Sequence, residues 1–90
     1  MDDVKIIELT LPVEFGGKTY DKIVLREPTA GEVVKAFNGA TGLAATILLV
    51  SIVSDIPRGA IEKVGISKVR EASEFLELFT STPGPAIGEN

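Results

Sequence analysis

The spacing of apolar residues changes at the boundary between Pro28 and Thr29, and this change constrains the fold more than any other feature. Before the boundary, apolar and polar residues alternate over positions 7–14, which is the period of a strand with one buried face. After it, apolar residues recur three and four positions apart, as on one face of a helix. The apolar members of the alternating segment are Ile7, Leu9, Leu11 and Val13. The sequence therefore predicts an α+β protein, with an N-terminal β-hairpin followed by about four short α-helices.

The hairpin is predicted to have strands at residues 4–13 and 19–26. Gly16 and Gly17 lie between them and supply the positive φ angles that a two-residue hairpin turn needs. Pro12 has no N–H to donate to a ladder, so its strand is an edge or Pro12 lies at a non-bonded position.

The register of this hairpin is predicted to contain an irregularity. A two-residue turn pairs Val13 with Tyr20, but it sets Leu11 opposite Lys22. One extra residue near Lys22 would instead pair Leu11 with Ile23, so that two apolar side chains share a face. We therefore expect a bulge or a longer loop in the second strand.

Four helices are predicted after residue 28. Thr29 and Glu32 have the spacing of a capping box at the start of the first helix, and Ser67 is a plausible cap for the last. The run of residues 43–53 is apolar nearly all round, which favours a buried helix; its β-branched residues leave a buried strand as the rival, and length favours the helix. The predicted helices cover residues 30–38, 42–54, 57–63 and 68–80. The predicted core faces are Ala30, Val33, Val34 and Phe37 in the first helix, and Val69, Ala72, Leu76 and Phe79 in the last.

The length and composition indicate a single small domain. The chain has 90 residues, of which 44 % are hydrophobic and 24 % charged, so it has enough apolar residues to fold. We expect a domain over residues 1–80 and a flexible C-terminal tail over residues 81–90, which are rich in Pro, Gly and Ser.

Several classes of function are disfavoured by what the chain lacks. It has no Cys and no His, so thiolate metal sites, Cys nucleophiles and the usual general base are missing. No cofactor or metal is expected. The net charge of −4 disfavours nucleic acid and anionic membranes as partners. The rival catalytic hypothesis is a small hydrolase built on Ser51 or Ser54, which has no base nearby in sequence. We predict that the protein is not an enzyme.

The remaining candidates are partner contacts. A lone hairpin leaves two strand edges open, and the apolar run is more than a small chain easily buries, so self-association is expected. For Arg26, an ion pair with Glu32 or Glu27 is the alternative to an anchor for a partner. For the others except Phe15, the alternative is an ordinary core position. The predicted partner-binding residues are Phe15, Arg26, Val34, Phe37 and Leu76.

The order of elements and one motif resemble a known family. The motif is the stretch from Arg26 to Glu32, which reads Arg-Glu-Pro-Thr-Ala-Gly-Glu. Together with the glycine-rich turn and a last helix ending in Phe79, it is similar to the small tail assembly chaperones of Mu-like and other contractile-tailed bacteriophages and prophages. The resemblance covers residues 6–80. It departs at Ser67-Lys68, where the family pattern has an acidic residue after the Ser.

The resemblance implies a non-catalytic role in the cytoplasm of a bacterial host. Such proteins bind the helical tape-measure protein and shield its apolar surface before the tail tube forms around it. Many have a longer form, made by programmed ribosomal frameshifting, through which contact with the tail tube protein is implied. The alternatives are a structural adaptor that stays in the tail, and a small oligomeric binding module.

Overall fold

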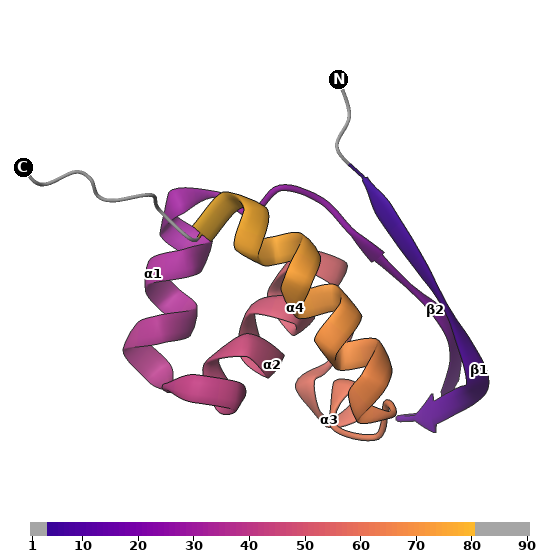
Figure 1. The fold of residues 1–90 in the computed structure, drawn as a ribbon. Helices are drawn as coiled ribbons and strands as arrows, with labels where there is room; N and C mark the ends of the chain where they lie inside the picture. Colours follow the sequence, from indigo (N-terminus) through magenta and orange to yellow (C-terminus); the bar gives the residue numbers. More distant parts are fainter. Residues whose placement is uncertain (1–3, 81–90) are drawn as a thin grey trace, which may run out of the picture.

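A long hairpin packs against one side of a group of four helices, as Figure 1 shows. The structure is a computed structural model and describes residues 4–80. Its elements are β1 (Lys5–Phe15), β2 (Lys18–Leu25), α1 (Ala30–Gly39), α2 (Gly42–Ser54), α3 (Arg58–Ile61) and α4 (Ile66–Thr80). The predicted α+β class and the order of hairpin and helices are confirmed. The tail predicted over residues 81–90 lies outside the described residues.

The turn of the hairpin follows the prediction. Gly16 and Gly17 have φ angles of 61° and 83°, and L-residues other than Gly, Asn and Asp rarely adopt this left-handed conformation. The turn places Phe15 opposite Lys18, and the ladder then continues with Val13 opposite a tyrosine, as expected. Local turn chemistry therefore sets this half of the register.

The two strands change register in the middle of the hairpin. Val13 lies opposite Tyr20, but Glu8 lies opposite Lys22, so the four residues 9–12 of β1 span the same distance as one residue of β2. The predicted irregularity exists, but it was placed on the wrong strand, because the extra residues belong to β1.

The pairing predicted for Leu11 is also wrong. Ile23 pairs with Ile7, and this places two side chains that are 0 % and 2 % exposed on the core face. Leu11 is 78 % exposed. Pro12 explains where the ladder breaks, because its ring nitrogen has no hydrogen to donate and the segment around it can leave the ladder at little cost.

The first helix begins with the predicted capping box. The backbone N–H of Glu32 donates to Thr29 Oγ1 at 3.1 Å, and the N–H of Thr29 donates to Glu32 Oε1 at 2.9 Å. Two of the backbone donors at the helix start are thereby satisfied. The helix ends at Gly39, one residue later than predicted.

The other helices agree with the prediction in order and differ at their ends. The bounds of α2 are those predicted, whereas α3 is only four residues long. The last helix begins at Ile66, two residues before the predicted start. Ser67 is therefore not its cap, because the N–H groups of Lys68 and Val69 already donate to the carbonyl of Gly65 at 3.0 and 3.2 Å.

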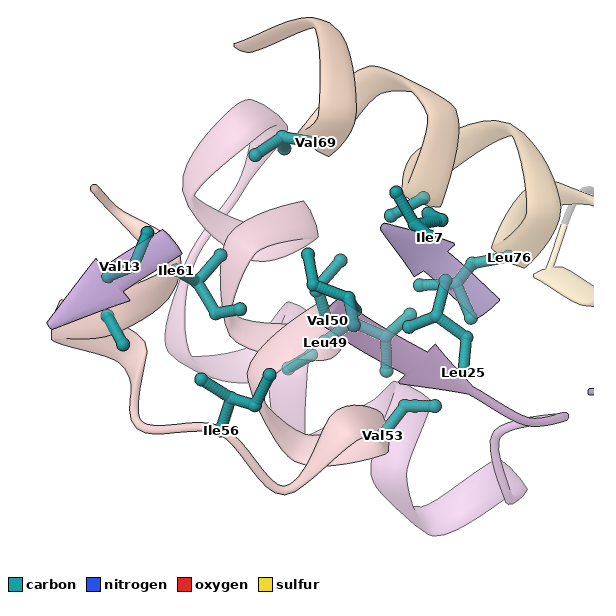
Figure 2. Packing of buried hydrophobic residues seen from close by; sticks show 14 residues of the cluster. Ile7, Val13, Leu25, Leu49, Val50, Val53, Ile56, Ile61, Val69 and Leu76 are labelled. Atoms are coloured by element: carbon teal, nitrogen blue, oxygen red, sulfur yellow. The ribbon is translucent and has the colours of Figure 1, made fainter. Parts of the chain in front are cut away.

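The core lies where α2 meets the hairpin and the other helices. Figure 2 shows Ile7 and Leu25 of the hairpin pointing toward Val50 of α2 and Leu76 of α4, and α2 contacts β2 and all three other helices. Burying a side chain of this size contributes about 1.5–3 kcal/mol. Because α2 contacts β2 and every other helix, it is the central element of the core.

Candidate functional site

A cleft of about 450 Å³ is lined by residues of α1, α2 and the second half of α4. Phe37 of α1 forms one wall, and Glu77 of α4 forms part of the opposite side. The floor is apolar, because Leu49 and Leu76 lie there and are each 3 % exposed. The lining residues are Phe37, Gly42, Thr46, Leu49, Ser73, Leu76 and Glu77.

The wall of the cleft carries large apolar side chains that the fold leaves exposed. Phe37 is 47 % exposed, and Val34, one helical turn before it, is 57 % exposed. Both belong to the predicted core face of the first helix, and that part of the prediction is wrong. The reason is the face that α1 turns toward the core: Ala36 is the fully buried residue and Val33 is half-buried.

An exposed leucine lies next to the cleft, and one lining residue is charged. Leu43, in the first turn of α2, is 55 % exposed and follows the lining residue Gly42, but it does not itself line the cleft. Glu77 is the one charged side chain among the described residues that line the cleft, and no described residue forms an ion pair with it. The cleft therefore offers an apolar surface with an anionic side.

The structure brings some of the predicted partner-binding residues together. Phe37 and Leu76 line the same cleft, and Val34 shares the face of α1 that bounds it. Leu76 belongs to the hydrophobic core and reaches the cleft only as part of its floor. The other two, Phe15 and Arg26, lie elsewhere: Phe15 packs against Gly59 beside the hairpin turn, and Arg26 directly follows β2. A binding role for all five stays a prediction.

Arg26 forms the ion pair that was its alternative role. Its guanidinium donates to both carboxylate oxygens of Glu32, at 2.9 and 2.8 Å. These hydrogen bonds, together with that from the backbone of Thr29, lower the pKa of Glu32 from 4.5 to about 2, and the bond to Glu32 raises the pKa of Arg26. The pair braces the end of the hairpin against the start of α1.

The residues of the rival hydrolase hypothesis use their hydroxyl groups structurally. Ser51 Oγ donates to the carbonyl of Ile56 at 2.6 Å, and Ser54 Oγ donates to the carbonyl of Val50 at 2.6 Å. Among residues 4–80, no three carboxylate side chains are grouped in a way that could hold a metal ion. None of the helices in this part of the chain combines the length and apolarity that a membrane crossing requires.

Sequence reasoning missed two surfaces. Ile6 and Val24 face each other across the hairpin and are 56 % and 41 % exposed, so the outer face of the sheet carries an exposed apolar pair. Leu11 and Lys68 line a second cleft beside the bulge. The alternation of apolar residues gave no sign of either, although Pro12 marks the segment that leaves the ladder.

Fold and cleft together define a small α+β protein with an apolar surface open to other chains. A family model described as "Phage tail assembly chaperone proteins, E, or 41 or 14" matches residues 6–81. The match covers most of the chain, which therefore belongs to this family of phage tail assembly chaperones, and the resemblance found in the sequence is confirmed. No curated protein and no solved structure matches the chain significantly.

Proposed function

We propose that this protein is a non-catalytic chaperone of the bacterial host cytoplasm that binds the tape-measure protein of its phage and shields that protein's apolar helices during tail assembly. Beyond membership of the family, one structural observation supports the proposal. Phe37 and Val34, two large apolar side chains one turn apart, stay exposed beside a cleft with an apolar floor.

The spacing of the exposed side chains beside the cleft suits a helical client. An amphipathic helix presents apolar anchors three and four positions apart and binds by laying them in an apolar groove. Val34 and Phe37 have the same spacing on α1, so a client helix packed against α1 can cover both. Covering apolar area contributes about 25 cal/mol per Å² before the costs of association are subtracted.

Charge favours a client with a basic flank. The chain has a net charge of −4, and the carboxylate of Glu77, which forms no ion pair with a described residue, lines the cleft. Lys or Arg residues beside the client's apolar stripe would meet Glu77. Such complementarity speeds encounter more than it adds affinity, and it weakens as salt is raised.

Co-expression tests this function. The tape-measure protein encoded by the same phage is produced in bacteria with and without this chain, and its soluble fraction is measured. We expect the chain to raise the soluble fraction and to co-purify with the tape-measure protein. Equal solubility in the two cultures contradicts the proposal.

The fate of the protein separates a chaperone from an adaptor. A chaperone leaves before the tail is complete, whereas a structural adaptor stays. Mass spectrometry of purified particles is expected to detect the tape-measure protein but not this chain. Its presence at a fixed ratio to tail proteins would favour the adaptor.

Two partner predictions accompany this proposal. The first is self-association, for which Ile6 and Val24 on the open face of the hairpin provide an apolar surface. The second is contact with the tail tube protein through a longer, frameshifted form. Immunoblotting of infected cells for a larger species tests whether that longer form is made.

A further inference from the structure

A second cleft lies beside the bulge of the hairpin, apart from the α1–α2–α4 cleft of the proposed function. It measures about 280 Å³ and is formed by β1, by the connection between α3 and α4, and by the first turn of α4. Its lining residues are Leu9, Thr10, Leu11, Lys63, Val64, Gly65, Ser67 and Lys68. Three independent features meet here, and together they indicate what this cleft binds.

The first feature is an unpaired stretch of strand. Residues 9–12 are extended but have no paired partner in β2, and β1 has no neighbour on its other side among the described residues. Main-chain donors and acceptors on such an edge are a ready template for another extended segment. Only Pro12 within the stretch lacks an N–H group.

The second feature is an exposed leucine at the same place. Leu11 is 78 % exposed, the highest value among the large hydrophobic side chains of the described residues. It shares the cleft with Val64, which is half-buried. An apolar side chain packed between the two would remove both from water.

The third feature is positive charge. Lys63 and Lys68 both line the cleft, and neither forms an ion pair with a described residue. By contrast, Lys5 and Arg58 are each paired with a glutamate. In a chain with a net charge of −4, this cleft is a local site of unneutralised positive charge.

We propose that the bulge cleft binds an extended, acidic segment of a partner protein. The segment lies along residues 9–12, its apolar side chain packs between Leu11 and Val64, and its carboxylates pair with Lys63 and Lys68. The site goes beyond client binding at the other cleft, whose one charged lining residue is the acidic Glu77. The two clefts therefore select partners of opposite charge.

The test uses fluorescein-labelled peptides and the whole chain. One peptide alternates leucine with glutamate, and its counterpart has lysine in place of each glutamate. We expect anisotropy to report binding of the acidic peptide only, and binding to weaken as salt is raised toward 1 M, where the Debye length falls to about 3 Å. Equal binding of the two peptides overturns the proposal.

Variants locate the site. The Lys63→Glu/Lys68→Glu pair is expected to weaken binding of the acidic peptide about tenfold or more, and Leu11→Ser to weaken it severalfold. The matched controls are Lys35→Glu, on α1, and Leu78→Ser, a leucine that is 75 % exposed on α4. Circular dichroism checks that every variant folds. If the Lys63/Lys68 reversal leaves the affinity unchanged, the carboxylates bind elsewhere and the proposal fails.

Two further measurements exclude other occupants. A peptide of residues 81–90 that binds more tightly than the acidic peptide would assign the cleft to the protein's own C-terminal segment. A fall in molar mass caused by the Lys63/Lys68 reversal would assign it to a second copy. Either result overturns the proposal of a separate partner. Val34→Ser/Phe37→Ser is expected to leave peptide binding unchanged, which keeps this test independent of the α1–α2–α4 cleft.

Discussion

Arg26, the residue after β2, and Glu32, in the first turn of α1, are joined by two parallel hydrogen bonds of 2.9 and 2.8 Å. Glu32 Oε1 also accepts the N–H of Thr29 at 2.9 Å. One carboxylate thus holds both the end of the hairpin and the cap of the helix. The pair therefore links the end of the hairpin to the start of α1, the helix that carries Phe37.

This pair predicts a specific dependence of stability on pH. The pKa of Glu32 is lowered from 4.5 to about 2 in the folded protein. A group with a lowered folded pKa stabilises fully above its unfolded pKa, and its contribution is lost as pH falls from about 4.5 through about 2. The side chains of Arg26 and Glu32 are 46 % and 23 % exposed, and solvent therefore screens the pair. We expect the pair to contribute only about 1 kcal/mol to the free energy of unfolding.

The measurement is the free energy of urea unfolding at neutral and acidic pH. Glu32→Gln should be about 1 kcal/mol less stable than the wild type at pH near 7 and should lose less stability between about pH 4.5 and pH 2. Glu14→Gln, on the exposed end of β1, is the control and should follow the wild type. Identical pH profiles for Glu32→Gln and the wild type would show that the pair contributes nothing.

The close approach of Phe15 to Gly59 predicts that alanine at position 59 destabilises the protein, which is the opposite of its usual effect in a helix. Alanine in place of a helical glycine normally stabilises by about 0.5–1 kcal/mol, and Gly31→Ala, where no atom lies within 4 Å of the new Cβ, should do so. At Gly59 the new Cβ would overlap the ring of Phe15. Gly59→Ala should therefore destabilise by about 1–3 kcal/mol. In a Phe15→Leu background that cost should disappear, and a cost that persists there would place its origin elsewhere.

The hairpin register is tested by two truncations. Ile7 is 2 % exposed and Leu11 is 78 % exposed, so Ile7→Ala should cost about 2–5 kcal/mol and Leu11→Ala less than about 0.5 kcal/mol. Chemical denaturation measures both. A large cost at Leu11 would support the continuous alternation that the sequence first indicated.

Self-association is tested at the open face of the sheet. Threonine keeps the preference for strand while removing apolar area, so Ile6→Thr/Val24→Thr should shift the molar mass in sedimentation velocity toward the 9.5 kDa of a single chain. Leu43→Thr, which is exposed on α2 instead, is the comparison. A mass that stays the same in the Ile6/Val24 variant would remove this face as an interface.

The features that sequence predicted are those set by neighbouring residues. The Gly16-Gly17 turn and the capping box of Thr29 and Glu32 depend on φ angles and hydrogen bonds within a few positions, and both are confirmed. The bounds of α2 follow from its apolar run. The helix ends at Ser54, and the next residue, Asp55, caps it in the left-handed conformation.

The features that sequence could not predict depend on distant packing. Alternation treats Leu11 and Ile7 as equivalent, and only the pairing of Ile7 with Ile23 separates them. Along α1, helical spacing groups Phe37 with the core, but the position of α2 decides that Ala36 is buried instead. Of the residues that line the cleft, the sequence singled out only Phe37 and Leu76, and it did not predict that Phe37 would be exposed.

The most direct test of the central claim is co-purification of the tape-measure protein with cleft variants. Val34→Ser/Phe37→Ser removes exposed apolar surface from α1, and Lys35→Ser, between them on the same helix but facing away, is the matched control. Both should unfold near the wild-type temperature. We expect the Val34/Phe37 variant to retain about a tenth or less of the tape-measure protein that the wild type retains, and Lys35→Ser to retain all of it. Full retention by the Val34/Phe37 variant would contradict the account.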